Sequence, residues 1–469
     1  MSSTSQPPVS PEALITNGLA GEALMAIQGE IITSADIYHL LVTSQVLRAT
    51  GDLKAAISSS RRALEIDPHN TSHILNQTIN LAFNGDSQAL QTYCNTLCEE
   101  LHASHELQGY LQKLSFAHNI LSDTTFSSSS SEAGRITQPS YIYADTNTKL
   151  RAPVRIGIND TPYIKSCSAV YDPTSRCWYE SENGLLIKDL LQSSWNAEGF
   201  AFESIPRIQL KHEELMRLKA DSLAIDEAST FMPIINHFGH FLTQCSPYLS
   251  FLSWIDSKTI QTLITNQQLP TYAAELLAIH PATQQMRIIS SEQNPIFCKN
   301  LIFSQQMWHE WHYASCNAFR FLEDVARIIL DTSTIDSPSR IYVSRSRVKT
   351  GLRISVNEEE VEARLRTKGF HAIHPQDLTL KEAISIFSRA DTIIGHAGSA
   401  MHNLIFSSRS REQQVYYLAH ELPAYNFHMV DCVKDFLNPV YLRKGCTEIK
   451  TEGTPWLIFY PDHIAELVA

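Results

Sequence analysis

The strongest constraint on the fold is an alternation of short β-branched runs with amphipathic helical stretches in the last third of the chain. The predicted strands are "RIYVS" (340–344), "HAIH" (371–374), "DTIIG" (391–395) and "QVYYLA" (414–419). The predicted helices between them are "EEEVEARLRTK" (358–368), "LKEAISIFSRA" (380–390) and a helix that begins at Ser399. Alternating units of this length predict a parallel, doubly wound sheet whose ligands bind beyond the carboxyl ends of the strands.

Two of these helices carry start signals in the sequence. Asn357 with Glu360, and Thr379 with Glu382, have the spacing of a capping box, in which side chains satisfy the first free N–H groups. Gly369 follows the first helix and is expected to end it.

The stretch "IIGHAGSAMHNLIF" (393–406) joins a predicted strand to a predicted helix. Gly395 and Gly398 permit tight turns and close approach of a ligand, and the helix that begins with Ser399 and Ala400 offers free N–H groups to an anion. Arg345 and Arg347 follow a neighbouring strand onto the same edge of the sheet, where their guanidinium groups can donate hydrogen bonds to phosphate oxygens. We therefore expect a phosphate cradle, although a plain strand-to-helix connection with capping side chains is the alternative. The residues expected along this edge are Ser344, Arg345, Arg347, His374 and 395–403.

The first part of the chain resembles a helical repeat. "TGDLKAAISSSRRALEIDPHN" (50–70) carries Gly51, Ala56, Ala63 and Pro68 at tetratricopeptide-repeat spacing, and "NGDSQAL" follows 34 positions later. A weaker echo lies at 17–27. We predict a short, all-α tetratricopeptide-like solenoid over residues 1–122, with an ordinary helical bundle as the alternative.

A serine-rich run, "TTFSSSSSEAGRITQPS" (124–140), predicts a linker over residues 123–140. The domain that follows, residues 141–335, contains predicted strands at 152–158, 259–265 and 300–304 and a predicted helix at 180–195. The alternating part, residues 336–469, forms the last predicted domain.

Composition limits the function classes. Hydrophobic residues make up 43% of the 469 residues and charged residues 18%, as in globular proteins, and the net charge of −12 argues against a nucleic-acid-binding surface. The nine cysteines form no CxxC pair, so neither a zinc site nor a disulfide framework is indicated. No secretory leader and no transmembrane span are predicted. The expected location is the cytoplasm, with a peripheral position at the inner face of the membrane as an option.

Several separated motifs together resemble family 61 glycosyltransferases, also called the DUF563 group, of a bacterial type. The matching residues are Arg345, Arg353, Asn357, Glu358, Gly398 and Asn403, and "NHFGHFLTQCSPYLSFL" (236–252) resembles the upstream Asn-x-x-Gly-His-aromatic stretch of the family. The chain departs from the family pattern at Ala397, where relatives often have histidine, and at Gln244 and Tyr248, where they often have an acid and an arginine.

The resemblance implies a GT-B-like α/β fold, in which two Rossmann-like domains face each other across a cleft. Residues 141–335 would be the acceptor side and 336–469 the nucleotide-sugar-binding side. It implies inverting transfer of a hexosyl or pentosyl group to a hydroxyl of a glycan, lipid-linked or protein acceptor, in bacterial surface polysaccharide synthesis or protein glycosylation. The donor-binding residues that we expect are Ser344, Arg345, Arg347, Arg353, Asn357, Glu358, Gly395, His396, Gly398, Ser399, Ala400, His402 and Asn403.

Inverting transfer needs a base that takes the acceptor proton, and histidine suits this task near neutral pH. His240 is the first candidate and His237 the second; a structural role for His240 is the alternative. His309 and His312 have i, i+3 spacing on a predicted helix but no third ligand nearby, so we expect no metal there. Arg353 either contacts the donor or positions Asn357.

A second class of function is also open at this point. The chain could be an adaptor in which the repeats bind a protein partner and the Rossmann-like part is a non-catalytic scaffold. Nucleotide-sugar binding followed by slow hydrolysis would distinguish the enzyme from the adaptor.

No Asp-x-Asp, the usual metal-holding motif of glycosyltransferases, occurs in the sequence. We therefore expect no cofactor, with arginine and helix N–H groups balancing the charge of the diphosphate. Transferase or donor-hydrolysis activity should survive saturating chelator. Loss of activity that manganese or magnesium restores would contradict this prediction and reopen the role of His309 and His312.

Overall fold

The structure is a computed structural model, and part of the chain is described in it. The described residues are 40–41, 43–44, 47, 52–68, 71–84, 89–90, 92–93, 136–137, 140–143, 148–151, 155–157, 162–191, 195–196, 199–200, 207–309, 313–348, 353–407, 412–419, 425–434, 436–442, 445–449, 454 and 456–468. Within these ranges, none of the helices has the length and apolar character needed to cross a bilayer.

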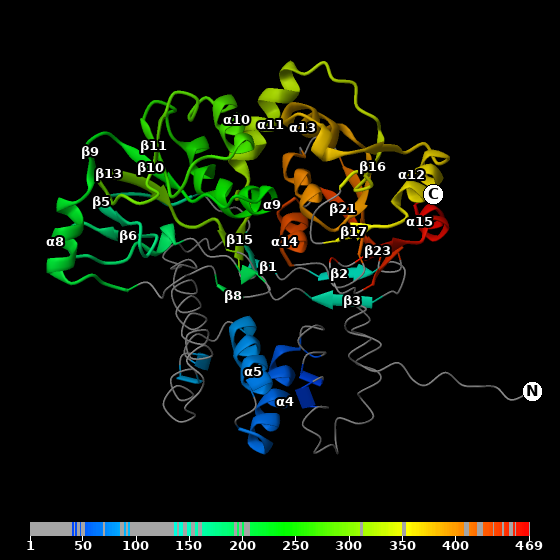
Figure 1. Cartoon of the computed structure of the whole chain (residues 1–469), viewed down its shortest axis with the longest axis horizontal. Helices are drawn as coiled ribbons and strands as arrows, with labels where there is room; N and C mark the ends of the chain where they lie inside the picture. The colour runs from blue at the N-terminus through cyan, green and yellow to red at the C-terminus, as the bar shows by residue number, and fades with distance from the viewer. Residues whose placement is uncertain are drawn as a thin grey trace, which may run out of the picture.

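The last third of the chain forms the expected parallel sheet. Its strands are β16 (Arg340–Val343), β18 (His371–Ile373), β19 (Thr392–His396), β20 (Gln413–Leu418) and β21 (Leu437–Leu442), in the spatial order β18-β16-β19-β20-β21. Figure 1 labels β16 and β21 of this sheet. The four strands predicted in this region are confirmed. The fifth, β21, extends the same parallel sheet.

Helices cover both faces of this sheet. They are α11 (Arg320–Thr332), α12 (Glu358–Arg366), α13 (Leu380–Arg389), the 3-10 helix η5 (Ser399–Phe406), α14 (Tyr425–Val433) and α15 (Pro461–Leu467). Neighbouring strand residues alternate between two cores: Ile393 packs on the side of α11, α13 and η5, whereas Ile394 packs on the side of α12 and α15. This period of two is what a sheet buried on both faces requires.

One of the two predicted capping boxes forms. Thr379 accepts a hydrogen bond from the Glu382 backbone N–H at 3.3 Å, and Glu382 accepts one from the Thr379 N–H at 2.8 Å. Asn357 is at the N-cap position of α12, but its side chain makes no cap bond, so that prediction is wrong. Its amide instead brackets Phe459 of β23 (Trp456–Phe459), donating to the carbonyl at 2.9 Å and accepting from the N–H at 2.8 Å. The longer-range pair replaces the local cap.

A hairpin from far upstream completes the C-terminal sheet. β2 (Ser140–Tyr143) runs parallel to β21, and β3 (Thr148–Arg151) pairs with β2 in the antiparallel sense. These residues therefore lie with the C-terminal sheet, not with the acceptor-side domain to which the predicted boundary assigned them. β1 (Ile136–Thr137) and the start of β2 also show that the end of the predicted linker is strand; residues 123–135 lie outside the described residues.

The middle of the chain forms a second, mixed sheet. Its order is β12 (Arg287–Ser290), β11 (Thr262–Thr265), β10 (Ser229–Met232), β13 (Ile296–Ser304), β5 (Ile164–Asp172) and β6 (Cys177–Glu180), and β9 (Leu223–Ile225) also pairs with β13. Strands β9 to β13 run parallel where they pair, whereas β5 and β6 are antiparallel. Its helices are α8 (His212–Ala220), α10 (Thr271–Ile279) and a continuous segment of α9 (Phe238–His240), the π-helix η2 (Phe241–Cys245) and the 3-10 helix η3 (Ser246–Trp254). The strands predicted near 259–265 and 300–304 are confirmed.

Short strands make three smaller sheets. The first contains β1, β4 (Arg155–Gly157), β15 (Tyr313–Ser315) and β14 (Trp308–His309), and β4 lies within the strand predicted at 152–158. The second contains β17 (Ile354–Ser355), β23 and β22 (Cys446–Ile449). The third is the pair β7 (Trp195–Asn196) and β8 (Gly199–Phe200). Residue 309 therefore lies in a strand, and the helix expected there is not formed. The side chain of His309 and all of His312 lie outside the described residues.

The helix predicted over 180–195 is wrong. Glu180 ends β6, and Gly184, with φ of +72°, turns the chain in a conformation that favours glycine. Leu186 then donates its N–H to the Ile208 carbonyl at 2.9 Å, and only the 3-10 turn η1 (Lys188–Leu190) follows. The apolar residues of this segment are buried from an extended chain rather than from one face of a helix.

Helix α11 joins the two α/β units. Its buried face, which includes Phe321, Val325 and Ile329, belongs to a hydrophobic core that also holds Leu249 of η3 and Phe387 of α13. Figure 1 shows α11 between α10 and α13, at the place where the two units meet. One continuous apolar core therefore fixes the units against each other.

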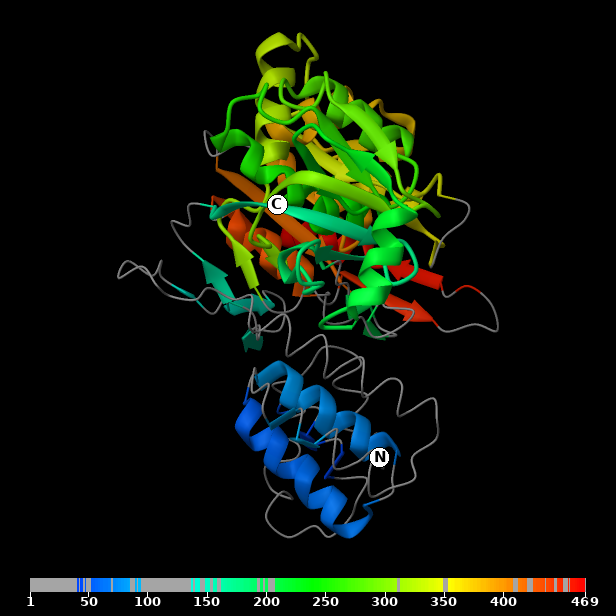
Figure 2. The same ribbon diagram turned by 90° about the vertical axis from the view of Figure 1, so that its left-hand side faces the viewer.

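Near the N-terminus, α4 (Leu53–Ile66) and α5 (Thr71–Asn84) lie side by side as the blue helices of Figure 2. Ala56 and Ala63 are completely buried, as close helix packing requires. The echo at 17–27 lies outside the described residues, so the repeat architecture of residues 1–122 stays a prediction.

A buried carboxyl group anchors α14 to the C-terminal sheet. Tyr417 donates to Asp431 Oδ1 at 2.7 Å, Tyr441 donates to Asp431 Oδ2, and His428 Nδ1 lies 2.7 Å from the Tyr441 hydroxyl. Because Tyr441 donates its proton to Asp431, its oxygen accepts the proton on His428 Nδ1. Burial raises the pKa of Asp431 to about 7, despite the two tyrosine hydroxyls that lower it.

This raised pKa predicts a pH dependence of stability. An unfolded aspartate has a pKa of about 3.9, so the stability that neutral Asp431 contributes is complete below that pH and is lost as pH rises through about 7. Asp431→Asn should remove the decrease in the free energy of unfolding that ionisation of Asp431 causes. This decrease is at most about 4 kcal/mol. Urea unfolding at pH 5 and pH 8 measures it, with Asp226→Asn, a surface carboxylate, as the control. Equal pH slopes for wild type and Asp431→Asn would contradict the prediction.

Candidate active site

The strand order defines where the C-terminal sheet opens. The chain leaves β16 toward β18 on one side and returns to β19 on the other, so the carboxyl ends of β16 and β19 diverge at a topological switch point. Crevices at such points are the usual ligand sites of doubly wound sheets. Arg345 follows β16 and the 396–403 turn follows β19, and the structure brings them together.

Arg345 lies at this switch point, beside the glycine turn. A Cβ atom placed on Gly398 would lie 3.5 Å from Arg345 Nη1 and 3.6 Å from His396 Nδ1, so both side chains border the turn. Arg345 Nη2 donates to the Arg353 carbonyl at 3.2 Å, whereas Nε is buried without a hydrogen-bond partner among the described residues. Burial lowers the pKa of Arg345. A partly buried guanidinium with an unused donor is prepared for an anion.

Glu358 fixes the backbone of Arg345. Its Oε1 accepts the Arg345 backbone N–H at 2.7 Å and the Tyr342 hydroxyl at 2.9 Å. The carboxyl group is buried, which raises its pKa. Glu358 therefore holds the Arg345 backbone in place from the buried side.

Glycine is needed at position 395 but not at position 398 for steric reasons. A Cβ on Gly395 would lie 2.6 Å from Met401 Sδ and 3.0 Å from Val343 Cβ, so glycine is required for packing between β16, β19 and η5. A Cβ on Gly398 would make only ordinary contacts. A side chain at position 398 would therefore fit beside Arg345 without a clash, whereas glycine at position 395 is needed for packing.

Three polar residues of η5 point in different directions. Asn403 is buried and donates to the Ala400 carbonyl at 2.8 Å, so it stabilises the turn from inside. His402 stacks on Phe427, with ring centroids 4.6 Å apart, and Asn426 Nδ2 lies 3.4 Å from its Nε2. Burial lowers the pKa of His402 to about 3, so its ring is neutral at pH 7. Ser399 lies at the start of η5, where it faces the other unit.

Helix α9 of the middle unit touches this turn. A Cβ on Gly239 would lie 2.7 Å from His402 Nδ1 and 3.4 Å from Ser399 Cβ, so only glycine fits there. His237 Nε2 lies 3.4 Å from Ser399 Oγ, and the rings of His237 and His240 are 4.7 Å apart between centroids. The two candidate bases therefore lie next to the glycine turn that we expected to hold phosphate.

Gln244 contacts His240 from one helical turn away. Its Nε2 lies 2.8 Å from His240 Nδ1, and because an amide nitrogen only donates, the ring proton is then on Nε2. Turning the amide so that its oxygen faces Nδ1 would move the proton to Nδ1 and leave Nε2 free to accept one. Burial, and to a smaller extent His237, lower the pKa of His240 to about 4, and burial also lowers the pKa of His237.

Several predicted donor residues lie elsewhere. Ser344 is buried and donates to Glu362 Oε1 at 2.5 Å. Arg347 is 63% exposed and pairs with Asp377 at 2.6 Å. Asn357 is engaged with β23, as described above. Arg353 contributes its carbonyl, which accepts from Arg345.

Two residues at the contact were not assigned a role from the sequence. Gly239 stands within the "NHFGHF" motif, but its function depends on a helix from the other unit. Gln244 follows His240 by four residues, the spacing at which helical side chains meet, and this signal could have identified it. Among the residues that the structure describes, no three His, Cys, Asp or Glu side chains are grouped as metal ligands.

The fold and site define a class of α/β enzyme, in which two sheets with parallel strands bring side chains to a shared contact. The family model described as Glycosyltransferase 61 matches residues 238–414, which run from α9 to β20 and include both sides of this contact. Over these residues the chain is similar to family 61 glycosyltransferases, and the match indicates a glycosyltransferase. A search of curated proteins finds no match.

The contact between Gln244 and His240 predicts a change in titration. Gln244→Glu places a carboxylate that accepts the Nδ1 proton and favours imidazolium, so the pKa of His240 should rise by roughly one unit or more. Histidine Cε1–H resonances followed from pH 4 to 9 measure this, with Gln244→Met as the control that has similar size and no hydrogen bond. An unchanged pKa for His240 in Gln244→Glu would show that the two side chains do not interact.

Proposed function

We propose that the protein is an inverting, metal-independent glycosyltransferase of GT-B architecture that moves a sugar from a nucleotide-sugar to a hydroxyl acceptor. The observation that carries this proposal is the convergence of Arg345 and the Gly398 turn with His237 and His240. The Arg345 guanidinium and the glycine turn lie on one side of the contact, and two neutral imidazoles lie on the other.

The C-terminal unit supplies the donor site in this proposal. The diphosphate lies at the switch point, where Arg345 beside Gly398 donates hydrogen bonds to its oxygens. The free N–H groups at the start of η5 add partial positive charge. Charge that develops on the leaving diphosphate is then balanced without a metal ion.

The middle unit supplies the base. As the acceptor hydroxyl attacks the anomeric carbon, the C–O bond to the diphosphate breaks, and His240 takes the hydroxyl proton on Nε2. This step requires the Gln244 amide to present its oxygen to Nδ1. His237, beside Ser399 at the cleft, is the second candidate for the same role.

The wider context of the reaction follows the sequence interpretation. The transferred group is a hexosyl or pentosyl residue, and the acceptor is a glycan, lipid-linked or protein hydroxyl in bacterial surface polysaccharide synthesis or protein glycosylation. The enzyme works in the cytoplasm, and the N-terminal helices recruit an acceptor or a protein partner.

Arg345→Ala tests the donor site. Loss of charged hydrogen bonds should weaken binding of nucleoside diphosphates by about 1.5–3 kcal/mol. Calorimetry with UDP, GDP and dTDP measures the affinity, and thermal unfolding checks that the fold is retained. Arg347→Ala is the matched control, because its exposed guanidinium pairs with Asp377 and its loss should change the affinity by less than about twofold.

Equal affinities for Arg345→Ala and wild type would remove Arg345 from the donor site. A wild-type protein that binds none of the nucleotides or nucleotide-sugars would favour the adaptor, in which the same scaffold is not catalytic.

A further inference from the structure

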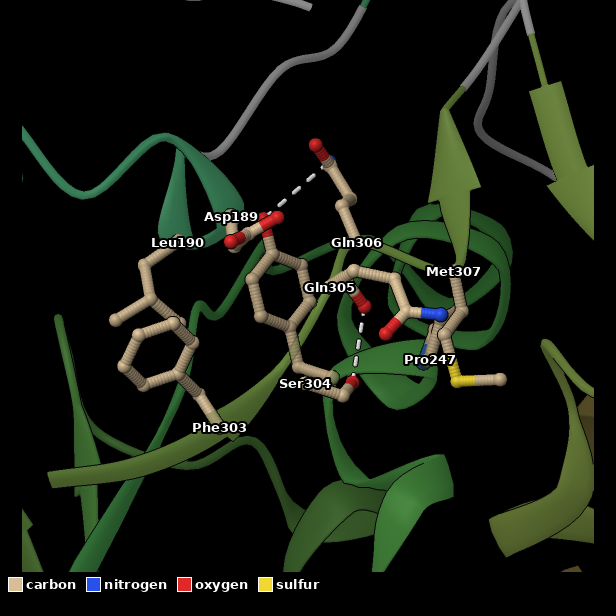
Figure 3. A pocket seen from close by; sticks show the side chains of 9 residues that line it. Asp189, Leu190, Pro247, Phe303, Ser304, Gln305, Gln306 and Met307 are labelled. Carbon is tan, nitrogen blue, oxygen red and sulfur yellow. Dashed lines mark hydrogen bonds between the residues drawn. The ribbon is translucent and has the colours of Figure 1, made fainter. Parts of the chain in front are cut away.

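A cavity in the middle unit is too small for an organic ligand. Figure 3 shows Phe303 and Met307 among the side chains that line it, and Ser304, whose hydroxyl donates to the Gln305 carbonyl at 2.9 Å. The space that remains holds about one water molecule. The surface of the C-terminal unit offers a different kind of binding site.

The small sheet β17-β23-β22 has one buried face and one exposed face. Leu457 and Phe459 of β23 and Cys446 of β22 belong to a hydrophobic core that α12 and α15 complete. Because side chains alternate along a strand, the residues between them point away from this core. The exposed face is therefore the side of the sheet opposite the two helices.

Strand register places three large apolar side chains in one row across the exposed face. Trp456 of β23 is opposite Ile354 of β17 on one side and Ile449 of β22 on the other. These side chains are between 37% and 46% exposed. The row is continuous because all three strands contribute to it.

A second row lies two residues further along. Ile458 of β23 is opposite Thr447 of β22, and Val356 directly follows β17 in the same register. The Val356 N–H donates to the Leu457 carbonyl at 3.0 Å, which holds it beside β23, and its side chain is 52% exposed. The two rows form a block of five apolar side chains and one threonine, which we call the apolar face.

The sequence around the apolar face is basic, although the chain as a whole is acidic. Residues 353–356 and 443–460 contain four basic residues, Arg353, Arg443, Lys444 and Lys450, against the two acids Glu448 and Glu452, which gives +2 in a chain of net charge −12. Exposed acids such as Glu359 and Asp462 belong to α12 and α15, on the other side of the sheet. Anionic lipids carry the charge that complements these flanks.

We propose that the apolar face docks the protein on a bilayer that contains anionic lipids. Trp456 and the isoleucines enter the boundary between headgroups and acyl chains, where tryptophan is favoured, and the basic flanks meet the lipid phosphates. A contiguous exposed apolar block marks an interaction surface. A second copy of the chain is a poorer occupant, because a two-fold contact would bring the same positive charge from both copies together.

Docking on a bilayer brings the donor site near the membrane. Arg353 directly precedes β17, and its carbonyl accepts the hydrogen bond from Arg345 Nη2 at 3.2 Å. A transferase held in this way meets a lipid-linked acceptor at the bilayer surface. This consequence rests on the proposed function, whereas the docking itself does not.

Vesicle sedimentation tests the docking. The full chain is mixed with vesicles of phosphatidylcholine, alone or with phosphatidylglycerol, and the bound fraction is measured after centrifugation. It should bind the mixed vesicles, and less strongly at high salt because ions screen the basic flanks. Trp456→Ala and Ile354→Ser should each reduce binding by about tenfold, the order expected when a large apolar side chain no longer leaves water.

Trp254→Ala is the matched control. Trp254 is also exposed, at 39%, but it ends η3 in the middle unit, so its loss should leave vesicle binding unchanged. Brominated lipids, which quench tryptophan emission, give a second readout. Trp456→Phe should remove most of the quenching and Trp254→Phe should retain it. Because phenylalanine keeps an aromatic ring, this variant tests the contact even if Trp456→Ala disturbs the fold.

Three outcomes would overturn the proposal. They are no binding to either kind of vesicle, equal binding by wild type and both apolar-face variants, and a dimer in light scattering that Trp456→Ala dissociates, which would show that a second copy covers the face. Nucleoside diphosphate binding is measured on the same samples. Vesicle binding without nucleotide binding supports the docking and defeats only the donor site, and nucleotide binding without vesicle binding does the reverse.

Discussion

The contact between Gly239 and η5 is the constraint on which the candidate active site depends. A side chain at position 239 would collide with His402, because its Cβ would lie 2.7 Å from His402 Nδ1, and relief of the collision would move α9 away from the glycine turn. His237 and His240 flank this glycine on the same short helix, so their distance from Arg345 and Gly398 is set by it. On the other side of the contact, His402 is buried and stacks on Phe427. The small size of Gly239 therefore lets the two units approach closely at the candidate active site.

The C-terminal fold could be predicted because its determinants are local. Strand and helix periods are legible within ten residues, and the Thr379–Glu382 box needs only a four-residue window. The helix predicted over 180–195 failed for the opposite reason. Leu186 and Leu190 have helical spacing, but the chain there is bound by Ile208 and by the hairpin of β6, and neither partner is evident in that window. Tertiary pairing overrode the local pattern.

The site was predictable in outline and less so in the roles of its residues. Placing Arg345 and residues 396–403 at one edge required only strand order. Asn357 was assigned to a cap because Glu360 follows at the right spacing, yet the partner of its amide is Phe459, about 100 residues away. Gly395 and Gly398 look equivalent in the sequence, and only the positions of Met401 and Val343 show that one serves packing. Roles fixed by distant neighbours cannot be derived from spacing.

The hairpin β2–β3 has a consequence for the timing of biosynthesis. Tyr143 pairs with Tyr441, roughly 300 residues later, so a strand made early completes a sheet made last. At about 5–20 residues per second, a ribosome needs on the order of 15–60 s to deliver β21 after β2 has formed. During that interval the middle unit is synthesised while β2 still lacks its parallel neighbour. Its exposed backbone edge is then open to other strands, and the chain is most vulnerable to aggregation just before the sheet closes.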